Sequence, residues 1–418
     1  MRVLKEIKKP NRDHALRVLQ CLVVAIRPLR VEELAEVLAV NFDDEEGMPK
    51  LNPNWRWADQ EQALLSSCSS LIAIVESDES RIVQFSHFSV KEFLTADRLA
   101  SSSGDISRYH IDLVPAHTIL AQACLSVLLR SDNRVEETGV GNSSPLARYA
   151  AEHWVAHAQD EKVSACLRKA MEYLFDVDKP YFAAWLELHD LDTSFPFGST
   201  FFMLDYGTKP NRSATPLYYA ARYGFQGLVE HLIANDPKQV TAEGGRYLTP
   251  FVVALGAGHF LTAKSLYDNG AHPNVKGYYR NTPLHSAAYY GYSEMVQVLL
   301  RYKADVHARN DSGCTPLHLI GLGPNQGTNS PQSLSNTARL LLEHGADVNA
   351  RDDTRFTPLH QAAQNRKVEV VRVLLEHGAD VGAEDEDGRT VLQVASAVGA
   401  DNDSTDEIMK LLSEHGAR

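Results

Sequence analysis

The stretch "SHFSVKEFL", residues 86–94, is the local motif that most resembles a catalytic site. Its polar members are Ser86, His87, Ser89 and Glu92, residue types that serve nucleophilic and acid–base chemistry. A structural interpretation explains the same stretch, because apolar residues surround them and would form one face of a strand-to-helix corner: Phe85, Phe88, Val90, Phe93 and Leu94. Ser89 followed by Glu92 has the spacing of a capping box, so we predict that Ser89 caps a helix.

Three further histidines, His285, His318 and His360, each follow the letters Thr-Pro-Leu. An imidazole at a position fixed by a repeated motif can hydrogen-bond the backbone and join one helical hairpin to the next. We therefore predict a structural role for all three. The sequence contains no H-E-x-x-H, G-x-S-x-G or C-x-x-C pattern and no dinucleotide-binding fingerprint between a strand and a helix. We predict no catalytic residue, no metal site and no cofactor.

The Thr-Pro pairs recur along the second half of the chain. They are Thr215-Pro216, Thr249-Pro250, Thr282-Pro283, Thr315-Pro316 and Thr357-Pro358, with Thr390-Val391 as a sixth copy without proline. The successive steps are 34, 33, 33, 42 and 33 residues. A period of 33 residues with "TPLH" in register is the signature of the ankyrin repeat, which this region strongly resembles.

Each part of the repeat has a physical reason. Proline at a first helical turn loses no hydrogen bond, and the threonine before it can cap the exposed amides. The second helix has apolar residues at helical spacing and ends at a glycine such as Gly345 or Gly378. One face of every helix pair stays apolar, so neighbouring repeats must stack into a solenoid. The long step holds nine extra residues within 321–336, which we predict to be a loop between two helices.

The bulk composition excludes several classes of protein. With 418 residues, 44% hydrophobic and 23% charged, the chain is long enough for two or three globular domains. Its formal charge of -13 opposes general binding to nucleic acid. The five cysteines are scattered, as expected for reduced thiols in a cytoplasmic protein. The longest early apolar run, residues 18–26, is about half of a bilayer span, so we predict no membrane partner.

Residues 1–205 do not repeat. Two amphipathic helices are predicted at 13–26 and 30–40, followed by a helix that runs into a strand within 59–77. A returning strand follows from 81, and a helix begins at about Ser89. Three helices, a two-stranded wing and a following helix predict a winged helix over 1–100. Apolar stripes predict a helical connector over 101–205 and repeats over 206–418, so the fold class is mostly α with a small wing.

The amino-acid sequences of these segments resemble those of one protein family. "RPLRVEELAEVLAV", "LLSSCSSLIAIV" and "VQFSHFSVKEFL" are similar to the winged-helix region of fungal NACHT-ankyrin proteins, which are of the STAND or NOD-like receptor type. "FAAWLELHDLD" and "ATPLYYAARYGFQGLVEHLI" resemble the entry into the ankyrin array of the same proteins. Such proteins carry a P-loop ATPase before the winged helix, whereas this sequence has no Gly-Lys dipeptide. The chain is expected to be either a shortened relative or a fragment.

The charge of the predicted winged helix argues against DNA binding. Residues 1–100 contain 13 Lys and Arg against 16 Asp and Glu, a net charge of -3. The segment that would enter a groove, 59–74, contains no Lys or Arg and could not clamp phosphates. Two functions therefore remain. The first is a non-enzymatic scaffold or recognition module that binds a protein through the ankyrin surface. The second is a fragment of a nucleotide-hydrolysing STAND ATPase whose P-loop lies upstream.

Aromatic and arginine side chains favour the first three repeats as the binding face. In an ankyrin array the concave surface is formed by hairpin tips and by outward positions of each first helix. Tyrosine and arginine there would anchor a protein interface, because they offer large contact area with a polar end. The predicted protein-binding residues are Tyr219, Arg222, Tyr223, Arg246, Tyr247, Tyr278, Tyr279, Arg280, Tyr289 and Tyr290. The alternative is that some of these rings fill gaps between repeats.

Overall fold

The computed structural model divides the chain into two compact units. It describes residues 4, 7–42, 48–55, 57, 59–68, 70–77, 80–101, 106–130, 144–188, 214–244, 249–323, 331–397 and 403–417. Unit 1 comprises residues 1–194 together with 225–232, and unit 2 comprises residues 195–224 and 233–418. The three-part division expected from the sequence stays a prediction.

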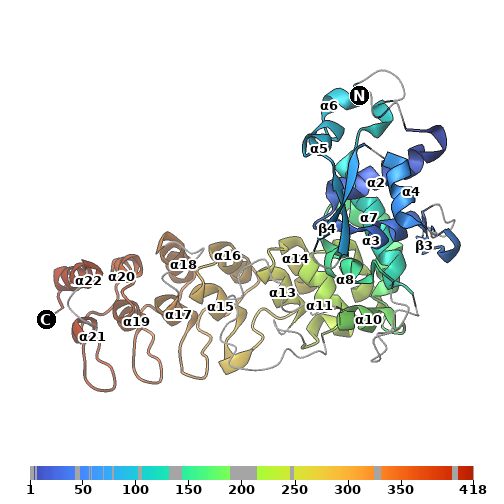
Figure 1. Cartoon of the computed structure of the whole chain (residues 1–418). Helices are drawn as coiled ribbons and strands as arrows, with labels where there is room; N and C mark the ends of the chain where they lie inside the picture. Colours follow the sequence, from blue (N-terminus) through green and yellow to red (C-terminus); the bar gives the residue numbers. More distant parts are fainter. Residues whose placement is uncertain are drawn as a thin grey trace. The chain divides into compact units, whose positions relative to one another are not determined.

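Unit 1 begins with three helices and a small sheet (Figure 1). The helices are α2 (Arg12–Val24), α3 (Val31–Leu38) and α4 (Gln60–Cys68). The strands are β1 (Leu29–Arg30), β4 (Ile72–Ser77) and β5 (Ser80–Phe85), in the order β1-β5-β4 and antiparallel throughout. Hydrogen-bonded pairs run from Ile72 opposite Phe85 to Ser77 opposite Ser80, while Leu29 faces Val83. The strands β4 and β5 are the predicted wing.

The remainder of unit 1 is mostly helical. It contains β2 (Val40–Asn41) paired with β3 (Lys50–Leu51), then α5 (Ser89–Leu94), α6 (Asp97–Ala100), α7 (Leu113–Leu128), α8 (Ala147–His157), α9 (Glu161–Leu174) and α10 (Tyr181–Leu188). Short 3-10 turns lie at Lys9–Asn11, Pro53–Trp55 and Ser107–Tyr109. Helix α7 packs against α2, α8 and α9 and is buried along most of its length. It therefore forms the centre of this unit.

An aromatic cluster forms around Trp154 of α8. The ring of Trp154 lies 5.4 Å from that of Trp185 and 5.6 Å from that of Phe225. Trp185 also donates its indole N–H to the carbonyl of Ala151, at 3.1 Å. Such pairs stabilise beyond the area they bury. Phe225 comes just before α12 (Gln226–Asn235), and this explains why residues 225–232 group with unit 1.

Two buried carboxylates join α3 to other segments of unit 1. Glu33, with no exposed side-chain surface, accepts hydrogen bonds from Arg27 at 2.8 and 2.9 Å and from the Arg30 guanidinium at 2.9 and 3.0 Å. The backbone N–H of Arg30 adds a contact at 2.8 Å, which closes the capping box of α3. Glu36 accepts from the N–H of Leu146 at 2.9 Å and from the Ser144 hydroxyl. A buried carboxylate requires such partners.

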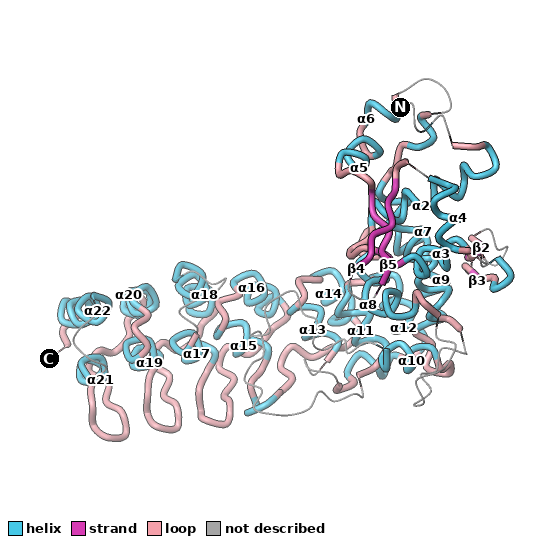
Figure 2. Tube along the Cα trace, in the orientation of Figure 1, coloured by secondary structure: helices cyan, strands magenta, loops and turns pink. Residues whose placement is uncertain are grey.

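From residue 250 onward, unit 2 contains helix pairs that follow one another in two rows (Figure 2), and a further pair precedes them, whose second helix lies mostly in unit 1. The first helices are α11 (Pro216–Tyr223), α13 (Pro250–Gly256), α15 (Pro283–Tyr289), α17 (Pro316–Leu322), α19 (Pro358–Gln364) and α21 (Val391–Ala397). The second helix of the first pair is α12, and those of the later pairs are α14 (Phe260–Asp268), α16 (Ser293–Arg301), α18 (Pro331–Glu343), α20 (Val368–Glu376) and α22 (Asp403–Glu414). We call these pairs repeats 1 to 6. Two 3-10 turns lie at Pro237–Thr241 and Tyr278–Arg280.

Two of the three repeated histidines, His285 and His318, have the structural role predicted for them, whereas His360 accepts from the N–H of Thr357 but has no hydrogen-bond partner at its Nε2 among the described residues. In repeat 3 the N–H of Thr282 donates to Nδ1 of His285 at 3.1 Å, and His285 Nε2 lies 3.0 Å from the carbonyl oxygen of Cys314 in repeat 4. Since Nδ1 accepts, Nε2 carries the proton and donates. His318 repeats this arrangement with the carbonyl of Phe356, at 3.1 Å. The imidazoles of His285 and His318 are fully buried, and each links its repeat to the next.

The predicted loop at 321–336 is shorter than expected. Helix α17 continues to Leu322 and α18 begins at Pro331, while residues 324–330 lie outside the described part. Leu334, Ala338 and Leu341 are buried at helical spacing, as expected for the apolar face of a helix. Helix α18 has 13 residues, whereas α16, the second helix of repeat 3, has 9. Part of the insertion is therefore helix, which a Ser- and Asn-rich sequence did not indicate.

The "SHFSVKEFL" corner differs from its prediction in two respects. Ser89 does not cap α5; instead, its own N–H donates to Nδ1 of His87 at 3.2 Å, and the two side chains lie 2.7 Å apart. Phe88 was expected on the buried face, yet 73% of it is exposed. The imidazole of His87 therefore accepts a backbone N–H of the first turn of α5. The expectation of a structural use for these polar atoms holds for His87 and Ser89.

Truncating a leucine in the repeat core is expected to destabilise unit 2. Leu284 and Leu359 are fully buried, and Leu→Ala at either position is expected to lower the free energy of unfolding by about 2–5 kcal/mol. Denaturation in urea measures the change. Leu261, which is 78% exposed on α14, provides the matched control. An equal loss in Leu261→Ala, or no loss in the other two, would contradict the assignment of the core.

Candidate functional site

The structure buries three of the residues predicted to bind a protein. Tyr219, Arg222 and Tyr290 are 5%, 3% and 5% exposed. The ring of Tyr290 stacks at 5.7 Å on that of Tyr292, and the rings of Tyr218 and Tyr219 meet edge to face at 5.3 Å. The expectation that these three face outward is therefore wrong. They fill space in the fold, the alternative considered for single tyrosines.

Other predicted residues remain accessible or lie outside the described part. Tyr279 and Arg280 are exposed at the hairpin tip of repeat 3, and Tyr223 and Tyr289 are half-buried at the ends of α11 and α15. Tyr278 lies in the same tip, but its side chain is outside the description, as are Arg246 and Tyr247 altogether. We call Tyr279, Arg280 and Tyr289 the tyrosine patch.

The tip that carries Tyr279 and Arg280 differs from three other tips of unit 2. Those begin with Asn310, Asp352 and Asp385, whose side-chain oxygens accept N–H groups two and four residues later at 2.8–3.0 Å. We call this pair of hydrogen bonds the clamp. Repeat 3 has Gly277 at this position, and glycine has no side chain with which to form it.

The backbone of this tip adopts a conformation that is costly for its residues. Arg280 has φ 54°, and the residues at the matching position of the three other tips, Gly313, Arg355 and Gly388, also have positive φ. Tyr279 is additionally left-handed, with φ 53°, and is 45% exposed. A left-handed conformation costs a non-glycine residue on the order of 1 kcal/mol. Hydrogen bonds from Asp311 N–H to the Tyr279 carbonyl and from Gly277 N–H to the Asn281 carbonyl hold the tip.

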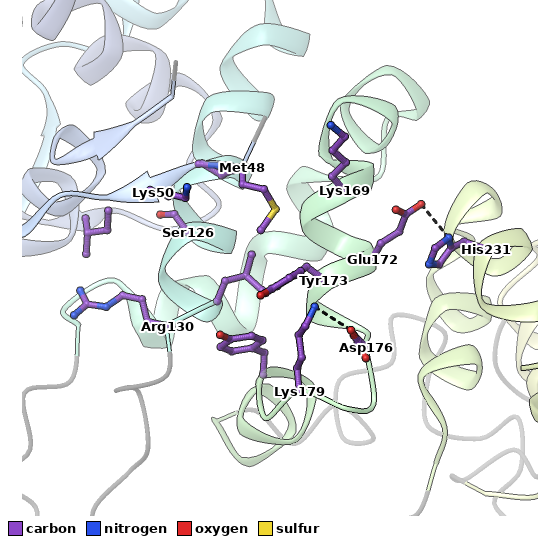
Figure 3. A pocket seen from close by; sticks show the side chains of 14 residues that line it. Met48, Lys50, Ser126, Arg130, Lys169, Glu172, Tyr173, Asp176, Lys179 and His231 are labelled. Carbon is purple, nitrogen blue, oxygen red and sulfur yellow. Dashed lines mark ion pairs between the residues drawn. The ribbon is translucent and has the colours of Figure 1, made fainter. Parts of the chain in front are cut away.

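A pocket in unit 1 was not predicted from the sequence. It has a volume of about 790 Å³, within the range of sites that bind small ligands. Strand β3 and the end of α7 form one side, and α9, the turn after it, and α10 form the other; His231 of α12 completes it. Figure 3 shows Tyr173 between Met48 and Lys179 in this view.

Ion pairs order one wall of this pocket. Lys179 Nζ lies 2.9 Å from Asp176 and 3.1 Å from the centre of the Tyr173 ring. The hydrogen bond from Lys179 lowers the pKa of Asp176 and keeps this carboxylate charged. Glu172 lies 2.8 Å from Arg168 and 3.4 Å from His231. Both carboxylates of the wall are thus engaged by basic side chains.

The pocket escaped the sequence analysis for a physical reason. Its lining comes from positions between 48 and 231, and each short segment reads as an ordinary amphipathic helix or turn. The spacing "EYLFDVDKPY", residues 172–181, brings Tyr173 and Tyr181 together across a turn, with ring centres 5.7 Å apart. That pair was the only local signal available.

The described residues provide no metal centre. Among them, no group of three or more His, Cys, Asp or Glu side chains could hold a metal ion. The five cysteines are all unpaired thiols. Within the same residues, no helix combines the length and apolar character needed to cross a bilayer.

Comparison with protein families matches the start and the C-terminal part of the chain. The family described as "GPI inositol-deacylase, winged helix domain" matches residues 4–104. "Ankyrin repeats (many copies)" matches 266–320, and "Ankyrin repeats (3 copies)" matches 330–418. The chain carries a winged helix and ankyrin repeats. The predicted fold class is confirmed: the protein is mostly helical, with a small N-terminal sheet and C-terminal ankyrin repeats.

Curated relatives match parts of the chain. The "Azaphilone pigments biosynthesis cluster protein L" of Monascus ruber is 29% identical over 283 residues, 65% of this chain and 58% of that protein. "Ankyrin repeat and SAM domain-containing protein 6" of Mus musculus is 44% identical over 28% of this chain and 13% of its own length. "Ankyrin repeat and SOCS box protein 16" of Mus musculus is 34% identical over 25% and 24%. The chain spans less than two thirds of each.

Proposed function

We propose that this protein is a non-enzymatic interaction module that binds a protein partner on the concave ankyrin face. Ankyrin repeats are a non-catalytic fold whose stacked units present an extended binding surface, and this supports a role in protein–protein interaction. In this proposal the winged helix packs within its own protein and does not bind DNA. The helix that would enter a groove, α4, contains no Lys or Arg.

The tyrosine patch is the proposed centre of the interface. The observation that carries this proposal is the exposed, left-handed Tyr279 beside Arg280, on a tip that lacks the clamp of the other three. Strained residues are retained where the surrounding structure or a function requires them. Tyrosine and arginine are also the types enriched among residues that dominate binding energy.

The proposal predicts loss of binding without loss of folding. A Tyr279→Ala, Arg280→Ala and Tyr289→Ala variant is expected to reduce capture of the partner by at least about 30-fold, which corresponds to roughly 2 kcal/mol. Affinity capture from lysate with quantitative mass spectrometry identifies the partner, and titration then measures the change in affinity. The melting temperature of the variant is measured alongside.

The chain provides a matched control in repeat 5. Thr354 and Arg355 are exposed at the tip positions that correspond to Tyr279 and Arg280. Thr354→Ala with Arg355→Ala is expected to leave capture unchanged. Equal capture by the patch variant would refute the proposed centre, and loss of folding in that variant would assign these residues to the core.

A further inference from the structure

A chain of hydrogen bonds in unit 1 runs from a half-buried histidine to the turn before the winged-helix sheet. Nδ1 of His117 on α7 lies 2.9 Å from Nδ1 of His157 on α8. Nε2 of His157 lies 2.9 Å from the hydroxyl of Tyr149, which accepts the backbone N–H of Ile26 at 3.3 Å. Residues 26–28 lead directly into strand β1. We call His117, His157 and Tyr149 the relay.

The backbone anchor of the relay fixes the direction of its hydrogen bonds. The N–H of Ile26 can only donate, so the Tyr149 oxygen accepts it and donates its own proton to Nε2 of His157. The proton of neutral His157 then lies on Nδ1 and is donated to Nδ1 of His117, whose own proton lies on Nε2. The opposite direction would leave the hydroxyl proton of the fully buried Tyr149 without an acceptor among the described residues, which is costly.

A second proton on His117 conflicts with this direction. Because Nε2 already carries a proton, the second one binds Nδ1, and two N–H groups then face each other across 2.9 Å. The conflict ends when the proton of His157 moves from Nδ1 to Nε2, so that His157 accepts from His117 and donates to Tyr149. The Tyr149 oxygen is then shared by two N–H donors, and its contact with Ile26 weakens.

The surroundings of the relay direct an added proton to His117. His157 is 1% exposed, whereas His117 is half-buried. Burial lowers the pKa of both imidazoles, that of His157 to about 3 with a contribution from His153, while the carboxylate of Asp160 acts to raise the pKa of His117. His117 therefore titrates first as the pH falls below 6.5. Other charged or titratable groups near the relay are Arg27, 4.9 Å from the centre of the Tyr149 ring, Glu33 paired with Arg27, Glu152 3.6 Å from His153, and the thiols Cys21 and Cys124.

We propose that the relay is a pH-sensitive switch, in which protonation of His117 reverses its hydrogen bonds and loosens the hold of Tyr149 on the turn at Ile26. The change reaches the winged helix, because Ile26 is followed by Arg27, which pairs with the buried Glu33 of α3, and then by β1. Clustered imidazoles serve as sensors of this kind in other proteins. The switch does not depend on the tyrosine patch, so either proposal can fail without the other.

Selective ¹⁵N labelling of histidine in the full chain tests the direction of the relay, because the nitrogen shifts of an imidazole report which nitrogen carries the proton. At about pH 7.5 the proton of His157 is expected on Nδ1 and that of His117 on Nε2. As the pH is lowered, with folding monitored by circular dichroism, His117 is expected to gain a proton on Nδ1 while the proton of His157 moves to Nε2 with the same midpoint.

Three outcomes of this titration would overturn the proposal. The first is a His157 proton already on Nε2 at about pH 7.5. The second is a His157 tautomer that stays the same while His117 titrates. The third is a His117 that remains neutral over the whole range of pH in which the chain is folded.

Variants test whether the signal reaches the turn. In a chain labelled with ¹⁵N-isoleucine, the amide resonance of Ile26, assigned by its loss in Ile26→Val, is expected to shift with the midpoint of His117. His117→Ala is expected to abolish this shift, and so is Tyr149→Phe, which keeps the ring and removes the hydroxyl. His110→Ala, which removes a half-buried histidine outside the relay, is expected to leave it unchanged. An Ile26 shift that persists in His117→Ala or Tyr149→Phe, or one that disappears in His110→Ala, would refute the switch.

Discussion

Acidification from about pH 7.5 to about pH 5 is expected to destabilise both units. Burial lowers the pKa of His157 from 6.5 to about 3, and that of His285 from 6.5 to about 4. Burial also lowers the pKa of further histidines, namely His117, His259, His318 and His360. In the unfolded chain these imidazoles take up protons near pH 6.5, whereas in the folded chain burial opposes their protonation, and His157 and His285 stay neutral at pH 5.

The sign of the effect follows from proton linkage. A folded pKa below the unfolded value means that the unfolded state binds more protons, so stability is complete above pH 6.5 and is lost as the pH falls from there. For each histidine that stays neutral in the fold, the free energy of unfolding falls by about 1.4 kcal/mol per pH unit below pH 6.5, which amounts to about 2 kcal/mol at pH 5. The carboxylates contribute little in this window, because they titrate in the unfolded chain at about pH 4.

Urea denaturation at a series of pH values measures this loss, and one variant isolates a single proton. His157 is 1% exposed, with Tyr149 Oη 2.9 Å from its Nε2 and His117 Nδ1 2.9 Å from its Nδ1. His157→Gln is expected to reduce the slope of unfolding free energy against pH by about one proton between pH 6.5 and pH 4. A wild-type stability that stays constant from pH 7 to pH 5 would show that the imidazoles are charged in the fold.

Removing the carboxylate of Glu33 is expected to cost about 3–5 kcal/mol, because two arginines lose a buried partner. Burial alone would raise the pKa of Glu33, but the hydrogen bonds from Arg27 and Arg30 outweigh burial and lower it. Glu33→Ala leaves Arg27 and Arg30, which are 33% and 39% exposed, without the acceptor that orders them. Thermal and urea denaturation of the full chain measure the loss.

Two further variants separate the charge from packing. Glu33→Gln keeps the volume and removes the charge, and most of the loss is expected to remain. Glu32→Ala, one position earlier on α3 and half-buried, is expected to change stability by less than about 0.5 kcal/mol. If Glu33→Ala were no more destabilising than Glu32→Ala, the arginine cluster would contribute little to the fold.

Local rules predicted the parts of the fold that depend on local geometry. The Thr-Pro turn restricts the backbone strongly, so its period located the first helices of repeats 1 to 5 without further information. The position of His285 in that motif was enough to predict its bonds to the backbone, because a repeat places each such residue beside the next copy. The wing strands also followed from their alternation, with Ile82 and Val83 in β5.

The errors arose where packing between distant residues decides the outcome. Tyr219 and Tyr290 lie at first-helix positions that the repeat pattern assigns to the surface, but neighbouring rings cover them. The pocket depends on Lys50 and Tyr173 being close in space, which no local period encodes. At Ser89, the neighbouring imidazole of His87 took the place of the expected cap.

The histidine link between repeats also bears on how an ankyrin array can lengthen. His285 donates from one repeat to the carbonyl of Cys314, the residue before the Thr-Pro pair of the next, and His318 does the same to Phe356. Repeats 3 and 4 therefore each contain a histidine donor for the following repeat, and repeat 4 also contains the acceptor for repeat 3, whereas Nε2 of His360 in repeat 5 has no hydrogen-bond partner within the described part of the chain. Duplicating a 33-residue segment that contains both groups would insert the donor and the acceptor together, so that each would find its partner at the new junction. Such a surface is self-complementary, so growth by tandem duplication requires no compensating substitution at the junction.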